Sequence, residues 1–180
     1  MNATPIVIVS GPPGSGKSSV ARRLAEQSIY ERAVHMHTDD FYQSIRKGYI
    51  STWLPEAQEQ NILVLEAFTA SAIRYAIGGY EVIVDGIIGP WYFEPWLKAV
   101  QDGFDVRFVV LRPDEQTTVA RAVARKHGAL VNPEIVGKMW KYFAHLGQYE
   151  SHALDTSIYT IDESVAMIRK TLVEGAMRLS

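Results

Sequence analysis

The chain has 180 residues, a formal net charge of −2 and no cysteine. This length predicts one domain over residues 1–180 that can bury a sizeable core. Without cysteine, a disulfide framework, a thiolate zinc site and a cysteine nucleophile are excluded. The balance of acidic and basic residues disfavours extended nucleic-acid binding. No apolar run is long enough to span a membrane and no signal-peptide pattern precedes the first strand, so we expect a soluble cytoplasmic protein.

The first predicted elements are a buried strand at residues 6–9, a glycine-rich loop, and a helix that continues to about residue 26. The loop fits the phosphate-binding pattern G-x-x-x-x-G-K-[ST] at every fixed position, and strand, loop and helix are the context that this pattern requires. Its glycines let successive backbone N–H groups turn toward an anion at the positive end of a helix. The predicted nucleotide-binding residues are Gly11, Pro12, Pro13, Gly14, Ser15, Gly16, Lys17, Ser18 and Ser19.

Two side chains of this loop have expected chemical roles. Lys17 would reach the β- and γ-phosphates of a nucleoside triphosphate, and the Ser18 hydroxyl would ligate Mg²⁺.

A second strand is predicted at residues 33–37, followed directly by two aspartates. In open α/β sheets, ligands bind beyond the carboxyl ends of the strands, so these carboxylates should lie on the same rim as the phosphate loop. A carboxylate there could take the proton of a substrate hydroxyl that attacks a γ-phosphate, and Asp39 is the candidate base. We interpret Asp40 as a helix cap or as a residue that helps to hold Mg²⁺ through water. The alternative is that both are solvated caps. His35 and His37 alternate in the strand and are interpreted as satisfied histidines, since no third metal ligand lies nearby in the sequence.

A long helix is predicted at residues 56–76, ended by two glycines. We expect its buried face to carry Ile62, Leu65, Phe68, Ala72 and Tyr75. The preceding segment, about residues 41–60, is the expected acceptor-binding insertion.

Aromatic residues are dense in the loops at this rim, and they favour an acceptor pocket for a partly apolar or ring-bearing molecule, with core packing as the alternative. They are Phe41, Tyr42, Tyr49, Trp53, Trp91, Tyr92, Phe93 and Trp96.

A third strand at residues 81–85 ends in Asp85, which fits the Walker B pattern of an acidic residue that holds Mg²⁺ directly or through water. The alternative interpretation is a turn residue, because Asp85 precedes Gly86.

A fourth strand is predicted at residues 106–111, and Asp114 is expected to cap the helix that follows it up to about residue 126. Pro133 is expected to open a further helix. A fifth strand at residues 156–161 and a C-terminal helix complete the chain. Strands alternating with helices indicate an α/β parallel sheet. Arg121 and Arg125 are four residues apart and so share a helix face, beside a possible lid at about residues 126–133. Their guanidinium groups would neutralise the negative charge that develops on the γ-phosphate. The alternative is a solvated basic face. For the catalytic role we favour Arg125 over Arg112.

Taken together, the sequence resembles the small P-loop kinases, most closely the chloramphenicol phosphotransferase-like and gluconate or shikimate kinase-like members that are often labelled AAA-family ATPases. The resemblance rests on residues 11–18, Asp39-Asp40-Phe41-Tyr42, Val84-Asp85-Gly86, and Leu111-Arg112-Pro113 with Arg121 and Arg125. It implies a three-layer P-loop NTPase fold with a five-stranded parallel sheet of order 2-3-1-4-5. It also implies that Asp39 is the catalytic base and that Arg121 and Arg125 contact ATP.

The resulting hypothesis is an ATP- and Mg²⁺-dependent kinase that phosphorylates a hydroxyl of a small molecule. Its catalytic residues would be Lys17, Asp39 and Arg125, with Ser18 and Asp85 at the metal and Arg121 at the nucleotide. One alternative is a 5′-hydroxyl polynucleotide kinase, because residues 39–45 also resemble the sequence pattern of those enzymes. The other is a nucleotide-binding regulatory protein with little transfer activity. The sequence does not identify the acceptor. For the oligomeric state it leaves two possibilities, a monomer or a homodimer.

Overall fold

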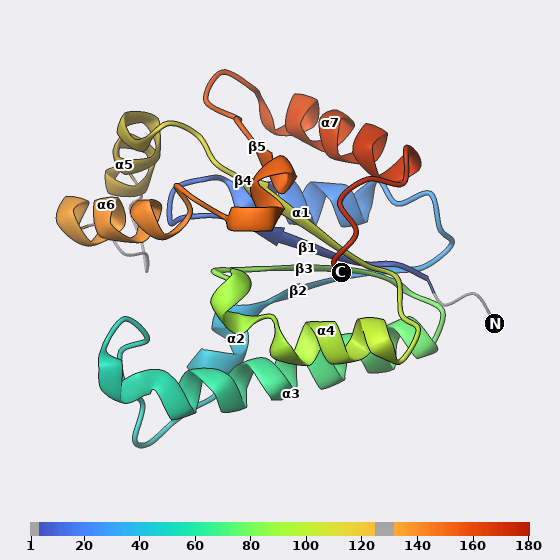
Figure 1. Cartoon of the computed structure of the whole chain (residues 1–180), viewed down its shortest axis with the longest axis horizontal. Coiled ribbons are helices and arrows are strands. Elements are labelled where there is room, and N and C mark those ends of the chain that lie inside the picture. The colour runs from blue at the N-terminus through green and yellow to red at the C-terminus, as the bar shows by residue number, and fades with distance from the viewer. Residues whose placement is uncertain (1–3, 125–131) are drawn as a thin grey trace.

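The computed structural model describes residues 4–124 and 132–180, and its centre is a five-stranded parallel sheet (Figure 1). The strands follow the spatial order β2-β3-β1-β4-β5. Their bounds are β1 Ile6–Ser10, β2 Ala33–His37, β3 Glu81–Gly86, β4 Val106–Leu111 and β5 Ala153–Leu154. The predicted fold class and strand order are therefore confirmed.

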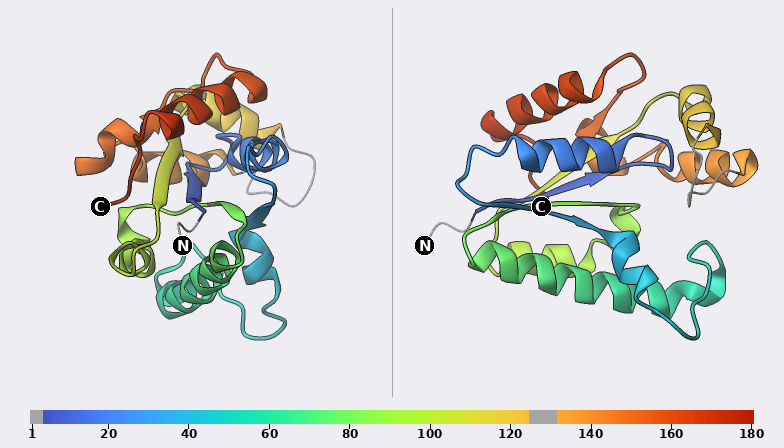
Figure 2. Two further views of the ribbon diagram at one scale, coloured as in Figure 1. Left: turned by 90° about the vertical axis from the view of Figure 1, so that its right-hand side faces the viewer. Right: turned by 180° about the vertical axis from the view of Figure 1, so that it is seen from behind.

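Helices cover both faces of the sheet and make three layers (Figures 1 and 2). One face is covered by α1 (Lys17–Glu26) and α7 (Ile161–Val173), and the other by α3 (Gln58–Ile77) and α4 (Glu94–Gln101). Successive side chains of a strand point to opposite faces, so each strand must be apolar on both sides. In β1, Val7 and Val9 join the core with α1 and α7, whereas Ile6 and Ile8 join the core with α3 and α4.

Three further helices gather at the carboxyl ends of the strands, on the left of Figure 1. They are α2 (Thr38–Gln43), α5 (Glu115–Val123) and α6 (Pro133–Tyr142). The short 3₁₀ turns are η1 (Pro55–Ala57), η2 (Pro90–Tyr92) and η3 (Gly147–His152). The predicted starts of two of these helices are confirmed. The Asp114 carboxylate accepts from Thr117 N before α5, and the side chain of Asn132 caps the proline-led α6.

The long helix lies where it was predicted, but its buried face is partly different. Leu65, Phe68 and Ala72 are buried as expected, whereas Ile62 and Tyr75 are exposed. The buried face also includes polar Asn61 and Thr69. Although α3 has 20 residues, no helix in the described part of the chain is long and apolar enough to cross a membrane.

The predicted position of the fifth strand is wrong. β5 is only Ala153–Leu154, and it pairs with the end of β4. Residues 156–161 instead form a turn and the start of α7. There the Thr160 hydroxyl oxygen accepts from the backbone N–H of Glu163, and the Glu163 carboxylate accepts from the backbone N–H of Thr160. This capping box satisfies backbone N–H groups locally, so the segment does not need a strand partner.

A buried ion pair connects α7 to the amino-terminal end of the sheet. Glu81, at the start of β3, is 1% exposed, and its carboxylate receives two hydrogen bonds from Arg169 at 2.6 and 3.1 Å. Arg169 also donates to the carbonyl of Leu24 at the end of α1, 2.7 Å away. This guanidinium therefore holds two helices and a strand together.

We expect Arg169→Met to lower the free energy of unfolding by about 3–5 kcal/mol, because it leaves the buried Glu81 carboxylate without its cationic partner and with only the Ser28 hydroxyl bonded to it. Urea denaturation measures the change. Adding Glu81→Gln should restore much of the loss, since the uncompensated charge is then removed. The matched control is Arg23→Met, which breaks a solvent-exposed pair with Asp162 and should leave the midpoint almost unchanged. Equal losses for the two single variants would contradict this account.

Candidate active site

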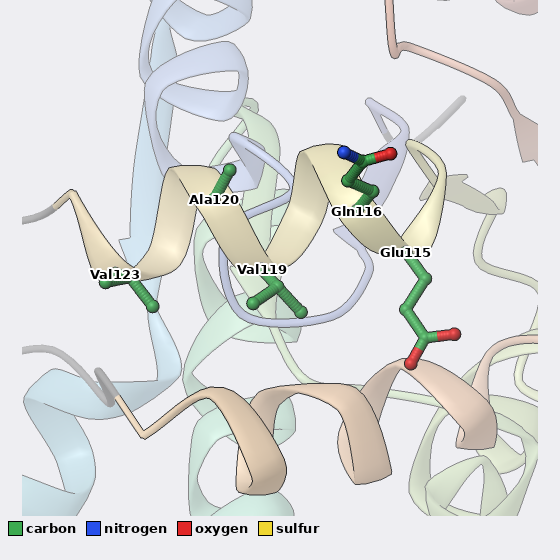
Figure 3. Close-up of a pocket in the computed structure, with 5 residues that line it drawn as sticks. All are labelled: Glu115, Gln116, Val119, Ala120 and Val123. Atoms are coloured by element: carbon green, nitrogen blue, oxygen red, sulfur yellow. The ribbon is translucent and has the colours of Figure 1, made fainter.

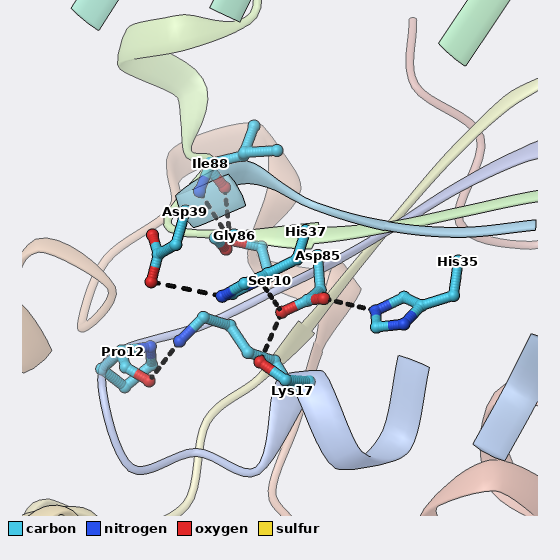
Figure 4. Close-up of polar contacts among 10 residues, drawn as sticks. Ser10, Pro12, Lys17, His35, His37, Asp39, Asp85, Gly86 and Ile88 are labelled. Carbon is cyan, nitrogen blue, oxygen red and sulfur yellow. Dashed lines mark hydrogen bonds and ion pairs between the residues drawn. The ribbon is translucent and has the colours of Figure 1, made fainter. Parts of the chain in front are cut away.

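The phosphate loop lies between β1 and α1 and is held by contacts at both ends. The Ser10 hydroxyl donates to the carbonyls of Gly86 and Ile88, at 3.1 and 2.5 Å, which ties the end of β1 to the segment after β3. At the other end, Gly16 has a left-handed conformation with φ of 88° and is followed directly by Lys17, the first residue of α1. The Lys17 ammonium lies 3.4 Å from the carbonyl oxygen of Pro12, inside the loop (Figure 4).

Helix α5 presses against this loop at Gly14. A Cβ atom at Gly14 would clash with the Thr118 carbonyl oxygen, and its φ of 92° is in the region that favours glycine. The loop and α5 therefore approach more closely than a side chain would allow.

A separate, open depression of about 650 Å³ adjoins α5 (Figure 3). Glu115, Val119 and Val123 point from α5 toward α6 there, so this depression is not the space enclosed by the phosphate loop.

Ser18 and Asp85 are in direct contact across the site. The Ser18 hydroxyl donates to Oδ2 of Asp85 at 2.6 Å. Because the hydroxyl proton faces the carboxylate, the oxygen lone pairs of Ser18 stay available for a cation. The two residues predicted for the metal side are thus brought together.

Both histidines of β2 are bonded to the same aspartate, which sequence reasoning missed. Nε2 of His35 lies 2.6 Å from Oδ1 of Asp85, and Nδ1 of His37 lies 2.9 Å from Oδ2 (Figure 4). The cause is the strand register, in which His37 is the direct partner of Asp85 across the β2–β3 pair. The sequence did contain a signal for this cluster. His35 and His37 form an H-x-H pattern at the end of one strand, and Asp85 stands at the end of another. The expectation that both histidines are satisfied is confirmed.

Asp39 lies in the first turn of α2 and turns back toward the loop. Its Oδ2 lies 3.2 Å from Nε2 of His37, and its carboxylate is close enough to Lys17 for the two charges to interact. Helix α2 approaches the end of β3 because Gly86 has no side chain there, and a Cβ atom would clash with Thr38. Asp40 is exposed, and its side chain does not provide the cap of α2, contrary to one of our interpretations.

The charges of this cluster stabilise one another. Hydrogen bonds to Asp39 and to Asp85 raise the pKa of His37 to about 10, so the ring is a cation at neutral pH. The hydrogen bond from His37, assisted by the charge of Lys17, lowers the pKa of Asp39 below its usual range. Burial alone would raise the pKa of Asp85, but hydrogen bonds from His35, His37 and Ser18 outweigh burial and keep it well below its usual range. Both carboxylates are therefore ionised at neutral pH.

The predicted arginines have different surroundings. Arg121 donates to the carbonyls of Thr156 and Ser157, at 3.4 and 2.9 Å, and so holds the loop after β5 against α5. Arg112 pairs with Glu150 at 2.6 Å and donates to carbonyls at the end of α6, which is a structural role. Arg125 and most of the expected lid, residues 126–131, lie outside the described residues.

Phenol groups gather around Tyr42, close to Asp39. The pKa of Tyr42 is raised by burial and by the nearby Tyr92, Asp39 and Tyr49, so two further phenols and the Asp39 carboxylate lie near the Tyr42 hydroxyl. The amide nitrogen of Asn61 lies 3.1 Å from the hydroxyl of Tyr92. The Oδ1 atom of Asn61 is buried without a hydrogen-bond partner in the structure.

A parallel sheet of strand order 2-3-1-4-5, with a phosphate loop directly after β1, defines the fold of the P-loop kinases. The chain belongs to the AAA-domain family, whose model matches residues 6–146. No curated protein matches the chain in sequence.

Solved structures share this fold over almost their whole length. The tunicamycin resistance protein of Deinococcus radiodurans superposes with a TM-score of 0.66 at 20% identity, over 98% of this chain and 99% of that one. A gluconokinase from Sinorhizobium meliloti 1021 gives a TM-score of 0.66 at 21% identity, over 98% and 99% of the two chains. A sugar kinase from Janibacter sp. HTCC2649 gives 0.64 at 17% identity, over 94% and 95%. At these identities the likeness establishes the fold, as the sequence resemblance implied.

The raised pKa of His37 predicts how stability depends on pH in the nucleotide-free protein. Its folded-state pKa of about 10 lies above the ordinary value of 6.5. The stability that His37 contributes is therefore complete below pH 6.5 and is lost as the pH rises toward 10. We expect the Tm advantage of the wild type over His37→Asn to shrink over this range in thermal melts. Lysine and tyrosine side chains titrate in both proteins, so their effects cancel in the Tm difference between the wild type and His37→Asn. A Tm difference that stays constant over this pH range would contradict the prediction.

Proposed function

We propose that the protein is an ATP- and Mg²⁺-dependent phosphotransferase that moves the γ-phosphoryl group of ATP to a hydroxyl of a small molecule. The observation that carries this proposal is the closeness of Asp39 to Lys17. A carboxylate that is ionised at neutral pH would share one rim with the lysine that binds the phosphates. Kinases need this pair, because the attacking hydroxyl must lose its proton beside the γ-phosphorus.

The nucleotide would be held by the phosphate loop, with Lys17 as the cation at its β- and γ-phosphates. Mg²⁺ would be held by Ser18 and by the phosphates. Asp85 would act through the hydrogen bond from Ser18 and through water, because histidines already occupy both of its oxygens. In the described residues no group of three or more acidic or histidine side chains could hold a metal by itself, which suits an ion bound mainly by nucleotide and water.

In the proposed transfer, the acceptor oxygen forms a bond to the γ-phosphorus while the bond to the bridging oxygen of ADP breaks. The acceptor proton passes to the Asp39 carboxylate. The charge that spreads over the γ-phosphoryl oxygens would be met by Lys17 and, as predicted from the sequence, by Arg125, with Arg121 on the nucleotide side. Chemistry of this kind depends mainly on positioning and electrostatics.

The acceptor would bind beside Asp39 and Tyr42, where Tyr49 and Tyr92 lie near the Tyr42 hydroxyl. Phenol rings offer apolar faces and hydroxyl groups, which suits a ring-bearing or partly apolar molecule that carries hydroxyls. The segment 41–60, proposed as the acceptor-binding insertion, is fixed to α3 where Gln60 bonds the backbone of Ile50 in both directions, at 2.8 and 2.7 Å.

The direct test measures ADP release with MgATP and a panel of alcohols, sugars, nucleosides, antibiotics and a 5′-hydroxyl oligonucleotide. We expect at least one small acceptor to stimulate release, and Lys17→Ala to lose most of that turnover. Stimulation by the oligonucleotide alone would indicate a polynucleotide kinase. Tight ATP binding without any acceptor effect would indicate a regulatory protein. Wild-type turnover in Lys17→Ala would contradict the role of the loop in catalysis.

Asp39→Asn should lower kcat by about 10²–10⁴-fold while ATP binding is retained, because the variant cannot take up the acceptor proton. Calorimetric titration with ATP checks the binding, and initial rates with the active acceptor check kcat. Asp40→Asn is the matched comparison, since it removes a charge from the adjacent position. A large loss in Asp40→Asn with a normal rate in Asp39→Asn would assign the base to Asp40.

A further inference from the structure

His37 contacts two carboxylates with the two nitrogens of one ring. Nδ1 lies 2.9 Å from Oδ2 of Asp85, and Nε2 lies 3.2 Å from Oδ2 of Asp39 (Figure 4). A planar ring held at both ends has little freedom to turn. His37 is also the last residue of β2 and the N-cap residue of α2, so its backbone is fixed by the sheet.

Asp85, the first of these two carboxylates, is itself held by other contacts. It is fully buried, with Oδ1 bonded by His35 and Oδ2 bonded by Ser18 at the start of α1. The ring of His37 is therefore attached to a part of the site that cannot move without breaking several hydrogen bonds of a buried charge.

Asp39, the second carboxylate, is in the opposite situation. Its side chain is 65% exposed, and it belongs to a six-residue helix that has no side-chain cap at its start. An exposed aspartate samples several rotamers unless a partner selects one of them. The contact with His37 supplies such a partner and directs the carboxylate toward the phosphate loop (Figure 4).

We propose that His37 is a positioning residue that holds the Asp39 carboxylate in its productive orientation, using buried Asp85 as the fixed point. This inference rests on the proposed function, in which Asp39 is the base. His37 touches neither the acceptor nor the phosphate in this scheme. Its contribution is the placement of Asp39, where an error of about 1 Å can cost 10²-fold in rate.

His35 provides the matched control within the same strand. Its ring bonds Oδ1 of Asp85, as described above, but it has no contact with Asp39 in the described structure. Replacing either histidine weakens the support of Asp85, and only the His37 replacement also releases Asp39. Asparagine is the substitution of choice at position 37, because its amide nitrogen lies near the place of Nδ1 and can keep the Asp85 contact.

A double-mutant cycle separates the two effects. We expect His37→Asn to lower kcat with the active acceptor by about 10–10²-fold, with little change in KM for ATP. In an Asp39→Asn background the same substitution should have little further effect, because the group that it positions has already lost its function. The effect of His35→Asn should be the same in both backgrounds. His37→Gln, whose amide reaches nearer to the place of Nε2, should recover part of the rate. A loss from His37→Asn that is as large in the Asp39→Asn background as in the wild type would overturn the proposal.

Crystal structures of His37→Asn and His35→Asn test the positioning without any activity. We expect the Asp39 side chain to leave its observed orientation in His37→Asn and to keep it in His35→Asn. An unchanged Asp39 in His37→Asn would overturn the positioning role, whether or not the protein is a kinase. A wild type that transfers phosphate to no acceptor would refute the proposed function alone, since the two structures would still decide how Asp39 is held.

Discussion

The structure of the site depends on one buried charge, the carboxylate of Asp85. A carboxylate with no exposed surface is costly unless hydrogen bonds and opposite charges compensate it. Ser18 from α1 and two histidines from β2 supply that compensation. The same bonds hold three elements together at the carboxyl end of the sheet. Displacing α1 or β2 would take hydrogen bonds away from a buried charge, so the site is specified by its electrostatics as well as by its packing.

This arrangement separates the two sides of the proposed chemistry. On the cation side, the Ser18 hydroxyl donates a hydrogen bond to Asp85, and its oxygen lone pairs would face the proposed Mg²⁺. On the acceptor side, His37 carries positive charge to Asp39 and keeps that carboxylate ionised beside Lys17. The two acidic groups would repel each other at this spacing, and the cationic ring between them removes the conflict. One histidine thereby allows two ionised carboxylates to lie in one small site.

Local sequence signals located most of the elements correctly. The apolar runs of β1, β3 and β4, the phosphate loop, and the helix starts at Asp114 and Pro133 can each be recognised from residues that are close in the chain. The fifth strand was misplaced because residues 156–161 include β-branched and aromatic residues, but Thr160 also forms a capping box with Glu163, and the local helix signal prevails. The buried face of α3 was only partly correct, since burial depends on the surrounding layers rather than on periodicity alone.

By itself the sequence determined the phosphate loop, because glycine spacing and the flanking strand and helix act over about ten residues. It also determined the class of sheet, because βα alternation with short connections leaves few topologies. The bonding of His35 and His37 to Asp85 was decided by the tertiary structure alone. His35 and His37 precede Asp85 by 50 and 48 positions in the chain, and only the register of two parallel strands brings them together. The same holds for Arg112 and Arg121, whose partners Glu150 and Ser157 are 38 and 36 positions away in the chain.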